Sequence, residues 1–386
     1  MKKKILLFVL VAVLVSATLA GCGSKETSSS NGDVIKIGVF EPMTGANAAG
    51  GEMTVEGIKL ANEKVGTVLG KKVELVIVDN KSDKVEATNA ASKLVDKDKV
   101  VAIIGSYGSS LSMAAGDVVK EAKVPAVGCS PTNPLVTLNN DYYFRVCFID
   151  PFQGTVMANY AFNELGAKKA AIIQDVQQDY SLGLSTYFEE AFIKLTGSAG
   201  SIVGKAAYNT GDQDFSAQLT NIKALNPDVI FAPGNDGESA LLIKQARDLG
   251  ITTPILGGDT WESPQFLEIG GSAVEGIVYS THFTAEAPVT ETSKTFLADY
   301  KAKFGKEANA FAALGYDAYM VIIDAIEKAG SADPVAIRDK IAGTTDFVGA
   351  TGIITLDVNG DAVKSAVINK VENGKFVYQT TVEPVK

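Results

Sequence analysis

The chain has 386 residues, of which 46% are hydrophobic and 21% are charged, a composition typical of a folded protein with a sizeable core. It carries 45 Asp and Glu against 35 Lys and Arg, which gives a formal net charge of −10. An acidic body repels phosphate backbones, so the charge argues against a nucleic-acid partner.

The first residues have the layout of a secretory signal peptide. Lys2–Lys4 form a cationic start, Ile5–Leu14 is an apolar run, and small residues follow as far as Cys22. This segment is too short and wrongly flanked for a stable membrane span, so we expect a cleaved signal over residues 1–21. Leu19-Ala20-Gly21-Cys22 resembles the lipobox of bacterial lipoproteins, which implies that Cys22 is the lipidation site and that two acyl chains anchor the mature protein. An uncleaved N-terminal anchor is the alternative, and the small residues before Cys22 argue against it.

Residues 22–33 contain no large apolar side chain, so we expect a flexible tether. Removal of residues 1–21 takes away three lysines and no acid, which shifts the net charge from −10 to −13. The chain that remains is longer than one typical hydrophobic core, which indicates two lobes.

Strands and helices alternate along the first part of the body. We expect strands at Val34–Phe40, Val73–Val78, Val100–Ile104 and Val124–Val127, and helices at Glu52–Val65, Asp83–Val95 and Ser109–Ala122. Such alternation with short connections predicts a parallel sheet with helices on both faces.

The alternation then begins again. We expect strands at Ala170–Ile173, Ile202–Tyr208, Asp228–Ala232 and Ile255–Leu256, and helices at Ser181–Leu195, Phe215–Leu225, Glu238–Leu249, Thr292–Phe304, Ala310–Ala329 and from Pro334. Asn359-Gly360 and Asn373-Gly374 are hairpin turn signals, so the final segments should be antiparallel. The predicted fold is α/β, with two doubly wound parallel-sheet lobes and a cleft at the carboxyl ends of their strands.

Catalysis and cofactor chemistry have little support. The chain has one histidine, His282, at the end of an expected strand, where a packed or surface role is usual. It has no Gly-x-Ser-x-Gly elbow and no His/Cys cluster with metal-ligand spacing, and Gly51-Glu52 puts a carboxylate where a phosphate loop needs lysine. We therefore expect a protein that is not an enzyme and that needs neither a cofactor nor a metal.

Hydroxyl-rich loops follow two neighbouring strands of the first lobe. Ser109 stands at the start of a helix, and Ser130 and Thr132 follow the next strand. Hydroxyls and the free N–H groups of a helix N-terminus can hold a carboxylate without lysine or arginine. Simple helix capping is the alternative.

An acid occupies the corresponding place in the second lobe. Asp259 follows a short strand. An acid opposite an anion-binding site would complement the ammonium group of a zwitterion. A role in a turn or as a helix cap is the alternative. Tyr180 follows another strand of this lobe, where it would either cover a ligand or pack on the following helix.

Four segments resemble the leucine/isoleucine/valine-binding protein family of ABC importers. They are residues 103–110, 129–134, 174–180 and 257–261, and the similarity extends from about Val34 to the end of the chain. The resemblance implies a periplasmic binding protein type 1 fold, in which two lobes joined by a three-segment hinge close on an amino acid. It implies a first lobe of residues 34–148 plus 281–350 and a second of residues 149–280 plus 351–386.

The same resemblance implies roles for individual residues. Ser109 matches the serine that binds the ligand carboxylate, and Thr132 matches a threonine that shares the amino-acid head group. Ser130 falls where a backbone carbonyl receives the ammonium, and Asp259 falls where the family carries a Glu that pairs with it.

Further positions concern the ligand's side chain. Tyr180 and Phe311 match aromatic positions that line the cleft. Gly50 stands where the family carries an aromatic residue and Asn235 where it often has tyrosine, and both changes enlarge or polarise the pocket. Trp261 could restore apolar wall area.

We therefore expect a monomeric solute-binding lipoprotein that sits on the outer face of the cytoplasmic membrane and delivers an amino acid, branched-chain or otherwise apolar, to an ABC permease. The alternatives are a ligand-sensing receptor that acts through a partner, and a binder of an amide, a nucleoside or an organic acid. Whether Cys129 and Cys147 form a disulfide stays open at this point, since spacing alone does not decide it.

Overall fold

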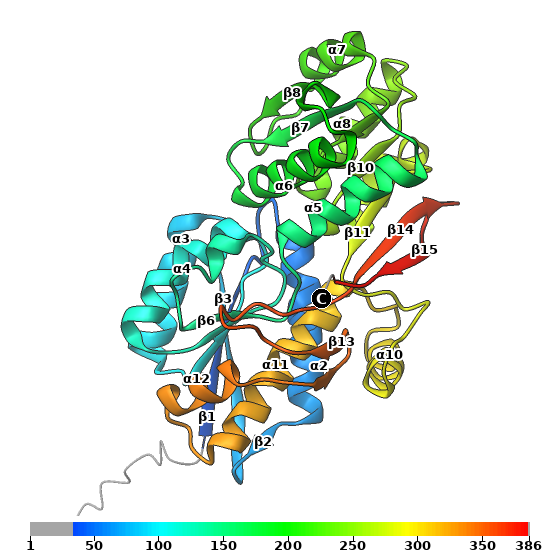
Figure 1. Ribbon diagram of the computed structural model, residues 1–386. Helices are drawn as coiled ribbons and strands as arrows, with labels where there is room; N and C mark the ends of the chain where they lie inside the picture. Colours follow the sequence, from blue (N-terminus) through cyan, green and yellow to red (C-terminus); the bar gives the residue numbers. More distant parts are fainter. Residues whose placement is uncertain (1–33, 385–386) are drawn as a thin grey trace, which may run out of the picture. The chain divides into compact units, whose positions relative to one another are not determined.

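A computed structural model describes residues 34–384 (Figure 1). The expected signal peptide, the tether and Cys22 lie outside the described residues. Among the helices of residues 34–384, we find none with the length and hydropathy needed to cross a membrane.

The first sheet has the strand order β2-β3-β1-β4-β5-β6. Its strands are β1 (Val34–Glu41), β2 (Thr67–Val68), β3 (Lys71–Asp79), β4 (Ala102–Ile104), β5 (Ala126–Gly128) and β6 (Tyr143–Arg145). The pairs β1–β4, β4–β5 and β5–β6 are parallel, so their carboxyl ends meet at one edge. Ile37, Val39, Ile103 and Ile104 are fully buried, as expected of a sheet covered on both faces.

The second sheet has the order β15-β14-β11-β10-β9-β7-β8. Its strands are β7 (Ala170–Asp175), β8 (Ile202–Tyr208), β9 (Val229–Phe231), β10 (Ile255–Gly257), β11 (Val278–Thr281), β14 (Ala366–Glu372) and β15 (Lys375–Val382). β7 to β11 pair in parallel, whereas β14 and β15 are antiparallel (Figure 1). The turn between them is Asn373-Gly374, with both residues at positive φ, so the predicted hairpin is confirmed.

The helices are α2 (Ala48–Lys64), α3 (Lys84–Lys93), α4 (Ser109–Ala122), α5 (Asp150–Asn159), α6 (Asp179–Thr196), α7 (Ser216–Leu225), α8 (Asp236–Asp248), α9 (Pro264–Gly270), α10 (Glu291–Phe304), α11 (Ala310–Ala329) and α12 (Pro334–Ala342). Along the chain, helices α2 to α9 lie between strands of the two sheets, and α10, α11 and α12 follow β11. Short 3-10 segments include η2 (Pro134–Val136) and η5 (Asp259–Trp261). The predicted α/β class with two parallel-sheet lobes is confirmed.

Two helices of the first lobe pack with their backbones in close approach. A Cβ added to Gly57 of α2 would lie 1.8 Å from the carbonyl oxygen of Ala312, and one added to Gly315 of α11 would lie 2.3 Å from that of Thr54. Each helix therefore presents a glycine to the other's backbone. A side chain at either position would separate the helices and open the core between them.

The chain passes between the lobes three times. Cys147 packs in the core of the first lobe and Phe148 in a core of the second, and the return passage lies between Thr281 of β11 and Phe283. The hairpin β12–β13 (Phe347–Gly349 and Gly352–Ile354) then packs with the first lobe, together with Ala362. The third passage consequently lies between Ala362 and Ala366, further along the chain than the residue 350 boundary expected from sequence.

The two cysteines of the body are both free. Cys129 and Cys147 have no exposed surface and lie in the hydrophobic core of the first lobe. The open question of a disulfide is answered in favour of two buried thiols.

Candidate functional site

The two hydroxyl-rich loops meet at the carboxyl edge of the first sheet. Ser109 begins α4 directly after β4, and its Oγ accepts a hydrogen bond of 3.1 Å from the backbone N–H of Asn133, which lies in the loop after β5. Ser109 is 1% exposed. Because β4 and β5 are parallel neighbours, both loops leave the sheet at the same edge, as the sequence predicted.

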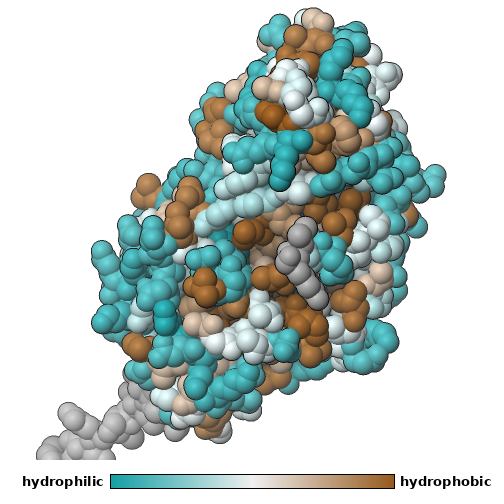
Figure 2. Space-filling model, in the orientation of Figure 1, coloured by the Kyte–Doolittle hydropathy of each residue, from teal (hydrophilic) through white to brown (hydrophobic). Residues whose placement is uncertain are grey.

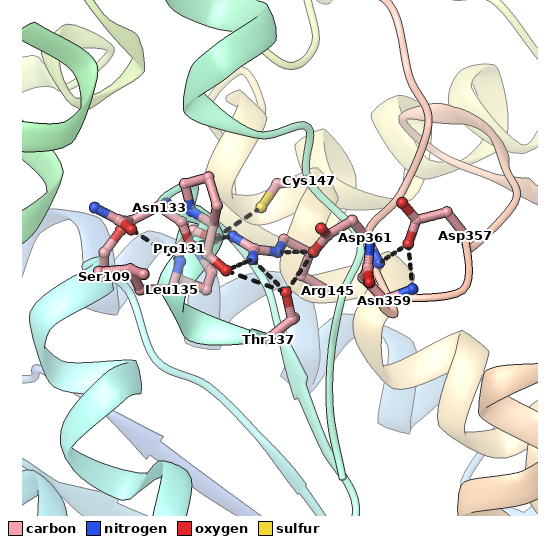
Figure 3. Close-up of polar contacts among 11 residues, drawn as sticks. Ser109, Pro131, Asn133, Leu135, Thr137, Arg145, Cys147, Asp357, Asn359 and Asp361 are labelled. Atoms are coloured by element: carbon pink, nitrogen blue, oxygen red, sulfur yellow. Dashed lines mark hydrogen bonds and ion pairs between the residues drawn. The ribbon is translucent and has the colours of Figure 1, made fainter. Parts of the chain in front are cut away.

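A buried arginine holds the second of these loops in place (Figure 3). Nη1 of Arg145, at the end of β6, donates to the carbonyl oxygens of Pro131 (2.6 Å) and Asn133 (2.8 Å), and Nη2 donates to Thr137 Oγ1 (2.8 Å). Nε pairs with Asp361 Oδ1 at 2.6 Å. Arg145 has no exposed surface, so its charge is balanced by this one carboxylate and by the carbonyl and hydroxyl oxygens to which it donates.

The hydroxyls of the loop remain without partners. Ser130 is 5% exposed and Thr132 is fully buried, yet neither hydroxyl makes a hydrogen bond among the described residues. Buried polar atoms in folded proteins are nearly always paired, and an unpaired one costs free energy. Two such atoms on one loop are the pattern expected where a ligand completes the hydrogen bonds.

The carboxylate of Asp259 is contacted by three side chains, from the second lobe and from a segment that passes between the lobes. Asp259 follows β10 in η5 and is 1% exposed. Its Oδ1 accepts from Gln153 Nε2 (2.9 Å) and from the hydroxyl of Tyr180 (2.9 Å), and its Oδ2 lies 3.0 Å from Nε2 of His282. The carboxylate is thus fixed in orientation by three separate elements.

His282 is fully enclosed beside Asp259. Burial lowers the pKa of its imidazole, although the hydrogen bond and the charge of Asp259 act in the opposite direction. A neutral ring that donates from Nε2 leaves Nδ1 as an acceptor, and Nδ1 has no partner among the described residues. The ring also packs against Phe148, tilted by 33°, with 3.9 Å between the ring centroids.

The first-lobe loop and Asp259 are connected through the start of α5. The backbone N–H of Asp150 donates to the carbonyl of Thr132 at 2.9 Å, and Gln153 lies one turn further along the same helix. Thr132 and Asp259 are therefore joined by a short path through residues 150–153. The sequence placed both residues at strand ends, and the structure brings them to one region.

A second path joins the lobes beside Tyr180. The side chain of Asn133 donates to the carbonyl of Asp179 (2.7 Å), and Ser110 Oγ donates to Asp179 Oδ2 (2.7 Å) and accepts from its backbone N–H (2.9 Å). Lys84 Nζ lies 3.2 Å from the same carboxylate. The start of α6 thus contacts the start of α4 directly.

An aromatic side chain fills the space beside Gly50. A Cβ added to Gly50 would lie 2.2 Å from Cε2 of Tyr107, so the glycine makes room for this ring. Tyr107 meets Phe311 edge to face at 5.0 Å and forms a buried cluster with Phe311 and Met53. The structure therefore places Phe311 with Tyr107, a residue that sequence reasoning did not single out.

Trp261 and Asn235 have different surroundings. Trp261 is fully buried in the core of the second lobe, stacked on Phe266 at 5.1 Å, and its ring occupies the space beside Gly257. Asn235 precedes α8, is 6% exposed, and its Nδ2 has no partner among the described residues. Their expected contact with a ligand stays a prediction.

Two buried glutamates border these residues. Glu41, at the end of β1, accepts from the backbone N–H of Tyr107 (2.6 Å), and burial raises the pKa of its carboxyl to about 8 despite this bond. Glu262 accepts from the backbone N–H of Ala310 at the start of α11 (2.9 Å), and burial raises its pKa to about 7. The Ala310 contact lets Glu262 cap a first-lobe helix from the second lobe.

Open grooves lie elsewhere on the protein. One of about 560 Å³ runs between α5 and β14–β15, and another of about 350 Å³ is lined mainly by residues 148–155 and 357–364. Figure 2 shows hydrophobic residues gathered near the end of the described chain. None of the predicted site residues lines either groove, and Ser109, Thr132 and Asp259 are each at most 1% exposed, so the candidate site is a buried cluster.

Sequence reasoning missed several members of this cluster. Tyr107 lies in the loop that we considered for its serines. The presence of an aromatic residue among these serines could have pointed to it. Gln153 and His282 come from two separate passages between the lobes, so neither shares a motif with Asp259. Arg145 lies in a short strand that hydrophobic periodicity does not reveal.

Comparison with known proteins gives a consistent result. The family model described as periplasmic binding protein matches residues 34–375. A leucine-binding protein, LivK, from Thermotoga maritima is 48% identical, with a TM-score of 0.88 over 91% of this chain and 99% of that one. The isoleucine complex of the branched-chain amino acid transporter substrate-binding protein LivJ from Streptococcus pneumoniae is 34% identical (TM-score 0.85; 91% and 100% covered).

A third solved structure extends the range of ligands. It is a solute-binding protein of an ABC transporter from Rhodopseudomonas palustris in complex with 3,4-dihydroxybenzoic acid, 26% identical, with a TM-score of 0.82 over 92% and 98% of the two chains. With the fold, the strand-end loops and the family match in agreement, the chain belongs to the periplasmic binding protein family.

Proposed function

We propose that this protein is the solute receptor of an ABC importer and that it binds an amino acid with an apolar side chain between its lobes. The relatives described as leucine-binding and as an isoleucine complex support this ligand class. The observation that carries the proposal is the pairing of opposite chemistries: hydroxyls without partners at Ser130 and Thr132, and a fixed carboxylate at Asp259. Hydroxyls can donate to the ligand's carboxylate or accept from its ammonium group, and Asp259 can supply the counter-charge of the ammonium group.

An aromatic carboxylate is the second candidate, because one relative is described in complex with 3,4-dihydroxybenzoic acid. Such a ligand would use the hydroxyls but offers no cation to Asp259. The two candidates therefore differ in whether the Asp259 carboxylate is needed.

A thermal-shift screen tests the proposal. We expect leucine, isoleucine or valine to raise the melting temperature, because a ligand that binds only the folded state stabilises it by about 2.7 kcal/mol at a concentration of 100 Kd. The screen should include amides, nucleosides, benzoate and 3,4-dihydroxybenzoate, followed by calorimetry for stoichiometry. Stabilisation by aromatic acids alone would contradict the amino-acid proposal.

The substitution Asp259→Asn tests the ammonium partner. We expect it to weaken amino-acid binding by about 3 kcal/mol, more than a hundredfold in Kd, because the ammonium group would lose its buried counter-charge. Asp248→Asn, at an exposed position of α8, is the matched control and should leave Kd unchanged. Equal affinity of the Asp259 variant and the parent, measured by calorimetry, would remove Asp259 from the site.

The contacts at Asp179 support closure of the lobes around the ligand. Ser110→Ala removes a partly buried hydrogen-bonded contact between α4 and α6, so we expect about 1 kcal/mol weaker binding, mostly through faster dissociation. Lys84→Ala should change binding less than twofold, since the Lys84 side chain is 54% exposed and solvent screens its ion pair. Stopped-flow dissociation rates decide the matter; an unchanged rate for Ser110→Ala would exclude this contact from closure.

We also propose that Cys22 carries a lipid anchor. The protein expressed with its leader should fractionate with membranes, and mass spectrometry of its N-terminal peptide should show a diacylglycerol on the Cys22 thiol. Cys22→Ser should release the protein or leave the leader uncleaved. Membrane association that survives this substitution would disprove the anchor.

A further inference from the structure

Asp150 is a buried carboxyl group with no assigned task. It lies at the start of α5, where the chain has just passed from the first lobe to the second. It has no exposed surface, and neither oxygen has a hydrogen-bond partner among the described residues. A helix start tolerates an acid, but burial of a carboxyl with both oxygens unpaired is costly, which makes a purely structural role a poor explanation.

The surroundings of Asp150 belong to the candidate site. Its backbone N–H is bonded to the carbonyl of Thr132, and the hydroxyl of Thr132 lies beside its carboxyl without a hydrogen bond of normal geometry between them. On the other side, a Cβ added to Gly183 of α6 would lie 2.6 Å from Asn133 Nδ2 and 3.1 Å from Asp150 Oδ2, so the glycine makes room for the Asn133 amide as well as for Asp150. The absence of a side chain at Gly183 leaves room for this carboxyl.

We propose that Asp150 is a positioning residue: its carboxylate accepts a hydrogen bond from the hydroxyl of Thr132, so that the lone pairs of Thr132 Oγ1 face the ligand's ammonium group. A hydroxyl is one donor and two acceptors, so fixing the direction of its proton decides which role it plays toward a ligand. Asp259 then supplies the direct counter-charge, and Asp150 acts through Thr132. This inference rests on the proposed amino-acid ligand.

Charged groups on each packed element act on Asp150. Burial raises the pKa of its carboxyl to about 8, and the charge of Asp259 acts in the same direction. The Thr132 hydroxyl and the Arg145 guanidinium lower it. On α6, the nearby phenols are those of Tyr180 and Tyr187, and the pKa of each is raised by burial and also by Asp150.

Ionisation of Asp150 makes both ligand affinity and stability depend on pH. The pKa of Asp150 is about 8, so at a pH below 8 most Asp150 side chains are protonated. An approaching ammonium group favours the ionised form. Ligand binding therefore releases a proton at neutral pH, and affinity rises with pH until about pH 8. A neutral form favoured by the folded state also means that stability without ligand falls as pH rises from the ordinary Asp pKa of about 3.9 towards 8.

Asp150→Asn separates these effects. In calorimetry with leucine or isoleucine, whichever the parent binds, we expect the parent to bind about tenfold or more tightly at pH 8 than at pH 6. We also expect it to release up to one proton at pH 7, read from two buffers of different ionisation enthalpy. The variant should bind more weakly at pH 8 with a flat pH profile, and its melting temperature without ligand at pH 8 should be higher than that of the parent. A structural residue would give a lower melting temperature.

Two controls complete the experiment. Glu41→Gln and Glu262→Gln remove two other buried carboxyls with a raised pKa and should leave the pH profile in place. In a Thr132→Val background, Asp150→Asn should cause little further loss, because Asp150 acts through Thr132.

The outcomes distinguish the two proposals. If the parent binds amino acids and Asp150→Asn keeps its affinity and pH profile, the role of Asp150 is wrong and the function stands. If the parent binds no amino acid at either pH, the proposed function fails and the role of Asp150 fails with it.

Discussion

The candidate site depends on one buried cation. Arg145 links the loop after β5 to the turn at Asp361, far along the chain. It donates to the backbone carbonyls of Pro131 and Asn133 in that loop. Breaking a buried pair of this kind typically costs about 3–5 kcal/mol, because the remaining charge is left without a partner. The loop that carries Ser130 and Thr132 can therefore keep unpaired hydroxyls, since its backbone is fixed by other means.

In the second lobe, too, neighbouring side chains fix the orientation of the candidate binding group. Asp259 is oriented by Gln153, Tyr180 and His282, which come from α5, α6 and the hinge. Three neutral donors hold the carboxylate without neutralising it. A fixed negative charge in a water-poor region is available to a cation that enters between the lobes, and its geometry does not have to be paid for at the moment of binding.

Much of the fold follows from patterns in the sequence. Alternating apolar runs located the parallel strands, and Gly- and Ser-rich segments after them located Ser109 and Thr132 at one sheet edge. The short strand that ends at Arg145 and the β12–β13 hairpin have too few residues for a readable period. The cluster includes Asp150, Gln153 and His282 because the chain passes between the lobes close to each of them. The spacing of residues in the sequence does not predict that these passages lie close together.

The ring of Tyr107 occupies the space that Gly50 leaves open. The resemblance places an aromatic residue at position 50, on α2, whereas here the aromatic residue comes from the loop before α4. The aromatic ring beside position 50 comes from a different segment, so the two positions are expected to vary together among relatives. Comparing sequences one position at a time would record the glycine as a loss, whereas the structure shows that Tyr107 fills the space beside it.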